Sequence, residues 1–145
     1  MKALLRLITL LYSMNRDIAA IVLYNEKNEI LLQFRDNNAP TLKNMWGFFG
    51  GKVENNETPY NAVIRETKEE LTYDLKNPKL IIIDQYDYKQ FKGKIFIFIK
   101  KYNKTKKLIQ NEGENMKFVS FTDIDNLNLI EMDKNLMKQI RKHIV

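Results

Sequence analysis

The sequence predicts a domain of the α+β or α/β class, in which short strands come before and after one central helix. Three observations support this prediction. Short β-rich runs separated by polar turns fill residues 18–49, helix signals occupy residues 58–71, and apolar side chains recur at helical spacing near the end of the chain. With 145 residues, of which 44% are hydrophobic, the chain is long enough to form one hydrophobic core.

Three strands are predicted before the central helix. Residues 18–24 and 29–35 are β-rich runs, and the polar turn at 25–28 between them is the signal of a hairpin. An aromatic run at 45–49 then leads into a pair of glycines at 50–51. Because glycine tolerates positive φ angles and close approach of the backbone, this pair predicts a turn.

The central helix is predicted to run from Pro59 to about Leu71. Thr58 is a suitable N-cap residue for it. Proline is well tolerated at the first helical position, because the N–H group that it lacks would have no partner within the helix. Good helix formers fill the rest of the segment.

Three carboxylates share one face of this helix, because Glu66, Glu69 and Glu70 stand at positions i, i+3 and i+4. Like charges this close are unfavourable unless a cation lies among them. Mg²⁺ takes oxygen ligands of this kind, often together with substrate phosphates. A solvated acidic face is the alternative. Arg65 is expected to point away from this face, with Glu57 as its partner.

Further strands are predicted after the helix. Residues 78–89 are predicted to form a strand or bent strand, in which Tyr86 and Tyr88 face the same side, toward either a core or a pocket. Residues 94–100 alternate apolar and basic or β-branched side chains and form the clearest central strand, with Gly93 in the turn before it. Another strand is predicted at 116–121.

The chain is predicted to end in a helical turn at 123–125 and an amphipathic helix from about Asp133. The apolar side chains of this helix recur at helical spacing and are Leu136, Met137, Ile140 and Ile144.

Residues 1–17 are expected to be an extension of a single domain that spans residues 18–145. Their apolar run is too short to cross a bilayer, and no small-residue cleavage site of a signal peptide follows it. We therefore expect a short helix or an upstream start here, and no membrane partner.

Composition narrows the classes of function. The chain has no cysteine and one histidine, which excludes disulfides, thiolate metal sites and histidine-rich metal sites and is compatible with the cytoplasm that we expect. The net charge of +6 is a reason to consider a nucleic-acid partner. The lysines are spread along the chain, with a modest cluster at 100–107, and no recognition motif accompanies them, so no stable nucleic-acid partner is expected.

The spacing around the central helix resembles a known signature. Gly51 is followed after five residues by Glu57, and after seven more by Arg65-Glu66-x-x-Glu69-Glu70. This pattern resembles the Nudix box of the Nudix hydrolases, metal-dependent enzymes that cleave a nucleoside diphosphate linked to another group. The resemblance covers about residue 18 to the end of the chain. It implies the Nudix fold, an α/β/α sandwich with a mixed β-sheet between helices.

Two positions depart from the Nudix pattern. Thr67 occupies a site that is usually aliphatic, which costs a little core packing. Thr72 stands where the family usually has a glycine that ends the helix. Because threonine adopts a left-handed C-cap conformation only at a cost, the helix is expected to end differently here.

The resemblance implies roles for particular residues. The carbonyl of Gly50 and four carboxylates would hold Mg²⁺, with Mn²⁺ as the alternative metal, and Arg35 and Lys52 would balance the phosphate charge of the substrate. Glu57 paired with Arg65 would hold the loop against the helix. The resemblance leaves open which glutamate is the general base. The catalytic set that it implies is Glu57, Arg65, Glu66, Glu69, Glu70 and Glu112, of which Glu66, Glu69, Glu70 and Glu112 are the metal ligands.

The glycine-turn motif and the short chain look like the MutT-like members of the family, which cleave nucleoside triphosphates, oxidised dGTP included, to the monophosphate and pyrophosphate. Glu131 stands where such members would have a base-reading asparagine, so selectivity for oxidised guanine is not implied. The alternatives are an ADP-ribose or sugar-nucleotide pyrophosphatase, and a catalytically silent Nudix-fold module that binds nucleotide or RNA. The intact glutamates argue against the silent module. Many relatives dimerise, so a homodimer is compatible with the resemblance.

Overall fold

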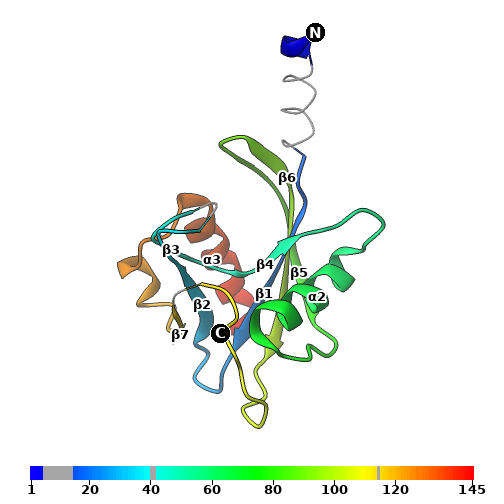
Figure 1. Ribbon diagram of the computed structural model, residues 1–145. Helices are drawn as coiled ribbons and strands as arrows, with labels where there is room; N and C mark the ends of the chain where they lie inside the picture. Colours follow the sequence, from blue (N-terminus) through cyan, green and yellow to red (C-terminus); the bar gives the residue numbers. More distant parts are fainter. Residues whose placement is uncertain (5–14, 40–41, 114) are drawn as a thin grey trace.

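The computed structural model of the protein describes residues 1–4, 15–39, 42–113 and 115–145 (Figure 1). The helices that carry the fold are α2 (Pro59–Leu71) and α3 (Glu131–Ile144), and a short 3₁₀ helix, η1 (Ile124–Asn126), precedes α3. The described strands are β1 (Ile18–Tyr24), β2 (Ile30–Arg35), β3 (Met45–Gly47), β4 (Phe49–Lys52), β5 (Lys79–Tyr88), β6 (Phe91–Lys101) and β7 (Asn115–Val119).

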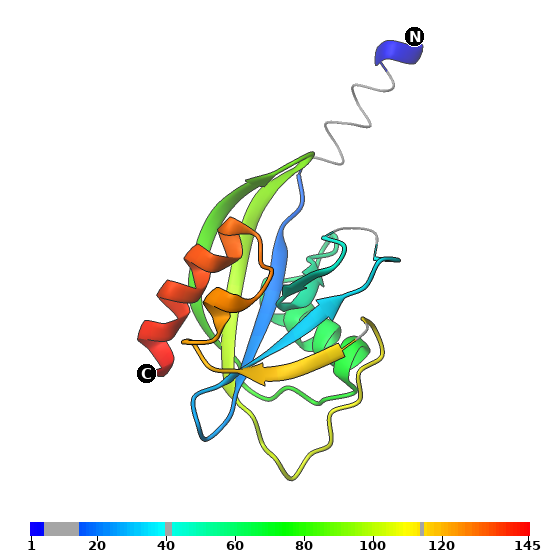
Figure 2. The same ribbon diagram turned by 90° about the vertical axis from the view of Figure 1, so that its left-hand side faces the viewer.

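The seven described strands form one mixed sheet. Five of them follow the order β3-β2-β1-β6-β5, while β4 pairs with β1 and β7 pairs with β2. Strands β1 and β6 are parallel, and the other pairs are antiparallel. The β5–β6 hairpin is long and curved and extends beyond the other strands (Figure 1). Helices α2 and α3 lie on opposite sides of the sheet, as Figure 2 shows, which gives the expected sandwich.

Strand β1 separates two hydrophobic cores, because its side chains alternate between the two faces of the sheet. Ala20 and Val22 point into the core that contains α3. Ala19, Ile21 and Leu23 point into the core that contains α2. All five are almost completely buried, which explains why β1 is a continuous apolar run and does not alternate with polar residues.

The predicted first hairpin is confirmed, with Tyr24 opposite Ile30. Asn25 stabilises its turn, because its side-chain oxygen accepts hydrogen bonds from the backbone N–H groups of Lys27 and Glu29. Asn28 takes a positive φ of 58° in the same turn. Strand β6 lies between β1 and β5, which confirms the prediction of a central strand at 94–100.

The predicted place of Gly93 in a turn is wrong. Gly93 lies within β6 opposite Tyr86, and the chain turns instead at residues 89–90. A Cβ atom on Gly93 would lie 2.5 Å from the backbone oxygen of Arg16. The residue is glycine because the segment before β1 passes directly over it, where Asn15 forms a parallel bridge with Lys92.

The predicted change at the end of α2 is also wrong, because Thr72 takes the left-handed C-cap conformation with φ 52° and ψ 38°. Its N–H donates to the carbonyl of Lys68, and its hydroxyl accepts a hydrogen bond of 2.8 Å from the side chain of Asn111. These bonds offset the cost of the conformation. Thr67 is fully buried, and its hydroxyl donates to the carbonyl of Val63 at 2.6 Å, so its polar group is satisfied inside the core.

The end of the chain follows its prediction closely. The expected helical turn is η1, and α3 begins at Glu131, two residues before the predicted start. The apolar positions Leu136, Met137 and Ile140 are buried as predicted. The short helix expected in residues 1–17 falls mainly on residues 5–14, which lie outside the described residues. Within the described part of the chain, no helix has the length and apolar character needed to cross a membrane.

Candidate active site

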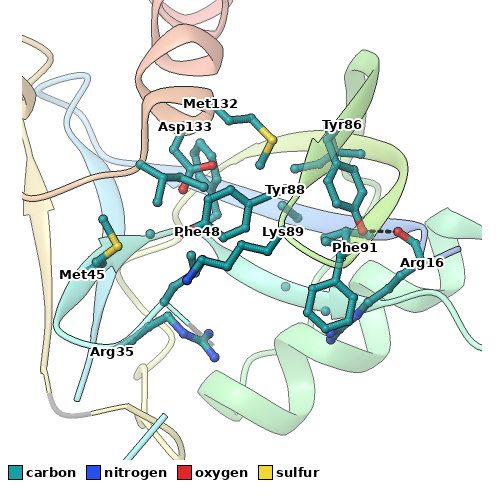
Figure 3. A pocket seen from close by; sticks show the side chains of 18 of the residues that line it. Arg16, Arg35, Met45, Phe48, Tyr86, Tyr88, Lys89, Phe91, Met132 and Asp133 are labelled. Atoms are coloured by element: carbon teal, nitrogen blue, oxygen red, sulfur yellow. Dashed lines mark hydrogen bonds between the residues drawn. The ribbon is translucent and has the colours of Figure 1, made fainter. Parts of the chain in front are cut away.

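A cavity of about 520 Å³ opens between the glycine pair of β4, the β5–β6 hairpin and the start of α3. Tyr86, Tyr88 and Phe91 of the hairpin form one wall, so the tyrosine pair faces a pocket (Figure 3). Phe48 and Met132 enclose the cavity from the other elements. The aromatic side chains in this lining suit a flat ring system.

The charged residues that line this cavity are mostly cationic. Arg16, Arg35, Lys43 and Lys89 carry positive charge, and Asp133 is the acidic residue among the described lining. Arg35 therefore lies where the resemblance places a phosphate contact. Lys52, the other predicted phosphate contact, is exposed and does not line this cavity, and its backbone carbonyl accepts a hydrogen bond from Arg65. Four cations around one cavity attract a polyanionic ligand.

The predicted turn at the glycine pair is wrong, because Gly50 and Gly51 lie within β4 and pair with Ala20 and Ala19 of β1. At this point of β4 the helix α2 lies against the backbone of the sheet. Gly50 has a φ of 144°, and a Cβ atom there would lie 2.3 Å from the backbone oxygen of Ala19. Its N–H donates to the Glu70 carboxylate at 3.1 Å. A Cβ atom on Gly51 would lie 2.5 Å from the Glu66 carboxylate. Glycine at residue 50 therefore leaves room for the backbone of β1, and glycine at residue 51 leaves room for the Glu66 carboxylate.

Glu70 is buried among other carboxylates. Its side chain is almost inaccessible, and burial raises its pKa to about 9, with the negative charges of Glu66 and Glu112 acting in the same direction and the Gly50 N–H opposing them. The structure thus brings Glu66, Glu70, Glu112 and Gly50 together, as predicted. A buried acid whose pKa is raised in this way, as that of Glu70 is, favours a proton or a metal cation.

Arg65 does not point away from the acidic face, so that prediction is wrong. It donates to both oxygens of Glu57, at 2.8 and 2.9 Å, which is the predicted pair. The same guanidinium also reaches Glu66 at 2.9 Å and Glu69 at 3.3 Å. The hydrogen bonds from Arg65, together with the backbone N–H of Glu54, lower the pKa of Glu57 to about 2. Arg65 therefore neutralises part of the acidic face and fixes the preceding loop.

The oxygen donors of this acidic cluster fit a hard divalent cation. Glu66, Glu70 and Glu112 offer only carboxylate oxygens as ligands. Burial and the charges of the other two glutamates raise the pKa of Glu70, so positive charge is lacking around this side chain. In the described residues, no three His, Cys, Asp or Glu side chains already stand in the arrangement of a metal site. Glu69, a predicted ligand, has a side chain that is 54% exposed and turned to Arg65. Glu66 and Glu69 are both ion-paired with Arg65, so a bound cation would share these carboxylates with the guanidinium.

The loop that carries Glu112 is attached to the end of α2. The backbone N–H of Asn111 donates to the carbonyl of Glu70 at 2.8 Å, and its side chain donates to the carbonyl of Glu69 at 2.8 Å. Ile109 donates to the carbonyl of Leu71 at 2.9 Å. These bonds satisfy helix-end carbonyls that lack partners within the helix, and they place Glu112 beside Glu70.

Asn111→Ala is expected to lower the free energy of unfolding by about 1–2 kcal/mol, because two side-chain hydrogen bonds at the helix end are lost. Urea unfolding followed by circular dichroism measures this change. Asn55→Ala, in an exposed turn, is the matched control and is expected to change stability by less than about 0.5 kcal/mol. Equal losses in the two variants would contradict the role given to Asn111.

Asp133 is a site residue that sequence reasoning missed. It is 5% exposed, it lines the cavity, and one of its oxygens lies 3.7 Å from where a Cβ atom on Gly47 would be. Glu131, which the resemblance placed at the base-reading position, is exposed at the start of α3 and does not line the cavity. A signal was present, because Asp133 stands three residues before Leu136 and four before Met137, on the apolar face of its helix.

Burial raises the pKa of Asp133 from 3.8 to about 7. Between these values the folded protein holds a proton that the unfolded chain has released, so stability falls as pH rises through this window, by up to about 1.4 kcal/mol per pH unit. Asp133→Asn is expected to remove this dependence. Urea unfolding at a series of pH values, with the exposed Asp125→Asn as control, measures it. Curves that stay parallel to the wild type would contradict the buried state of Asp133.

Comparisons with known proteins agree with this geometry. A family model described as NUDIX domain matches residues 14–142. An 8-oxo-dGTP diphosphatase of Proteus vulgaris is 35% identical over 74 residues, which are 49% of this chain and 62% of that relative, so the match spans less than two thirds of the relative's length.

Solved structures share the fold. The MutT protein of Methanosarcina mazei Go1 superposes with a TM-score of 0.77 at 20% identity and covers 90% of this chain and 96% of its own. A MutT Nudix hydrolase of Burkholderia pseudomallei gives a TM-score of 0.75 at 21% identity over 88% of this chain and 98% of its own.

Proposed function

This chain belongs to the Nudix family, and from that membership we propose that it is a metal-dependent hydrolase that cleaves a nucleoside triphosphate to the monophosphate and pyrophosphate. The predicted family and the predicted Nudix fold are confirmed. The substrate, the metal and the roles of the individual residues are proposals.

One observation carries the proposal: a cluster of carboxylates around the buried Glu70 adjoins a cavity that is aromatic at one side and lined by four cations. A nucleoside triphosphate has the matching parts, which are a flat base, a polyanionic chain and phosphate oxygens that bind dications. A cavity that binds an uncharged ligand does not need four cations beside a group of carboxylates.

Glu66, Glu70 and Glu112 would hold Mg²⁺ or Mn²⁺, with Glu69 and the Gly50 carbonyl completing the predicted ligand set. When bound, the metal supplies Lewis acidity at the phosphate oxygens and a lowered pKa for a coordinated water. The Gly50 N–H, at 3.1 Å from Glu70, orients that carboxylate.

Arg65 holds Glu66 and Glu57 in place through its guanidinium, and Arg35 would bind phosphate. These residues act by positioning and by balancing charge, which are the main contributions of a protein to phosphoryl chemistry.

Asp133 is the residue that we assign to base recognition. A carboxylate that faces the cavity from the start of α3 accepts hydrogen bonds from N–H groups and so favours a guanine-type edge, which presents two of them side by side. The Proteus relative is named an 8-oxo-dGTP diphosphatase, and with this assignment we propose a guanine nucleotide as the substrate of the present chain too.

A panel of nucleotides tests the proposal. The protein is incubated with 8-oxo-dGTP, dGTP, dATP, ADP-ribose and UDP-glucose, with Mg²⁺, with Mn²⁺ or with EDTA, and the products are separated by ion-exchange chromatography. We expect metal-dependent release of pyrophosphate from a guanine triphosphate. Cleavage of ADP-ribose alone would favour the alternative hydrolase, and nucleotide binding without cleavage would favour the silent module.

A further inference from the structure

We propose that Arg16 is a substrate-binding cation that contacts a phosphate oxygen of the nucleotide from the side of the cavity opposite Arg35. The inference rests on the proposed function of the same site. Figure 3 shows the two arginines on opposite sides of the cavity, with Arg35 at the end of β2 and Arg16 just before β1. Neither composition nor motif spacing pointed to Arg16.

The backbone of Arg16 is held at two points, which fixes where its side chain starts. Its N–H donates to the carbonyl of Lys92 at 2.8 Å. Its own carbonyl accepts a hydrogen bond from the Tyr86 hydroxyl (Figure 3). Gly93 allows this approach, because any Cβ atom there would collide with the Arg16 carbonyl. A functional side chain on a backbone fixed in this way is preorganised.

The side chain of Arg16 has an unused hydrogen-bond donor. Its guanidinium carbon lies 5.1 Å from the centre of the Phe91 ring, so the plane is supported by an aromatic face. Its Nε atom is buried and finds no acceptor within the part of the chain that the structure describes. A buried donor without an acceptor is costly, and an oxygen of a bound ligand would satisfy it.

The register of the sheet places Arg16 and Arg35 toward opposite ends of the β3–β4 segment. Strand β4 runs antiparallel to β1, so that Ala19 lies opposite Gly51 and Ile18 opposite Lys52. Arg16 continues this direction beyond Lys52, whereas Arg35 lies opposite Met45. Asp133 lies by Gly47, toward the opposite end of the same β3–β4 segment. The forked N–H donors of a guanidinium match two phosphate oxygens. A guanidinium has no acceptor atom, so it cannot accept a hydrogen bond from a base.

Binding of inorganic tripolyphosphate and of the α,β-imido analogue of dGTP, measured by calorimetry, tests this inference. Arg16→Gln removes the charge at similar length and is expected to weaken binding of both probes by about 10- to 100-fold. Arg16→Lys keeps the charge without the fork and is expected to fall between Arg16→Gln and the wild type. The exposed Lys94→Gln is the control and is expected to change neither affinity more than about twofold.

Three results would overturn the inference. Unchanged binding of tripolyphosphate in Arg16→Gln would exclude a phosphate contact. If only the binding of the dGTP analogue were weakened, Arg16 would be assigned to the base. Binding by Arg16→Lys as tight as the wild type would exclude the forked contact. Failure of the proposed function is distinguishable from failure of this inference, because the two have different readouts. If the wild-type protein hydrolysed no nucleotide, Arg16→Gln would still be expected to weaken its binding of tripolyphosphate.

Discussion

Glu70→Gln is expected to abolish hydrolysis while the fold survives. Glutamine has nearly the same volume, and its carbonyl can still accept the hydrogen bond that Gly50 donates to Glu70 at 3.1 Å. Glutamine cannot ionise, so the carboxylate that would bind the metal at the centre of the acidic cluster is lost. Because a catalytic metal stabilises the transition state by several kcal/mol, we expect turnover to fall roughly a thousandfold or more.

Pyrophosphate release with saturating Mg²⁺ measures this loss, and circular dichroism with thermal unfolding checks the fold. Glu131→Gln is the matched control, because Glu131 is an exposed glutamate on the other helix and does not line the cavity. Its turnover is expected to stay within about twofold of the wild type, since a single exposed charge changes little. Near-normal turnover in Glu70→Gln would show that the metal site has been assigned to the wrong residues.

Gly50→Ala is expected to destabilise the protein by about 3 kcal/mol or more. The residue has a φ of 144°, and the new Cβ atom would lie 2.3 Å from the backbone oxygen of Ala19 and 2.7 Å from the Cα atom of Ala20. Backbone atoms of a central strand cannot rotate away as a side chain can, so β4 must shift. Strained backbone and overpacking each cost about 1–3 kcal/mol.

Thermal unfolding measures this effect, and a loss of about 3 kcal/mol corresponds to a fall in Tm of roughly 10 °C for a domain of this size. Gly47→Ala is the matched control on the same segment. Its Cβ atom would meet its nearest neighbour, an oxygen of Asp133, at 3.7 Å, an ordinary van der Waals distance, so its Tm is expected to stay within about 3 °C. A similar fall in Tm in both variants would mean that β4 does not require glycine at residue 50.

Local patterns in the sequence were sufficient for much of the fold and part of the site. The hairpin at 25–28, the start of α2 at Thr58 and Pro59, and the pairing of Glu57 with Arg65 all involve residues within about eight positions of each other. Interactions over such short separations depend mainly on turn and helix geometry, which the residue types specify directly.

Other predictions failed where the outcome depended on a distant segment. Thr72 takes a left-handed conformation because Asn111, thirty-nine residues away, donates to its hydroxyl. Gly93 lies in a strand because Arg16 passes over it. The prediction for Arg65 failed for a local reason, because its guanidinium is large enough to bind Glu57 and the acidic face at once.

The sequence by itself determined the family and the helix that carries the acidic residues, because these depend on spacing within a short stretch of chain. The predicted glycine turn was wrong, because pairing with β1 makes Gly50 and Gly51 part of strand β4. Only the tertiary structure decided which residues line the cavity. Arg16, Asp133 and the β5–β6 hairpin meet there because the order and register of the strands bring them together. Strand order and register arise from packing between segments far apart in the chain, and no local propensity specifies them.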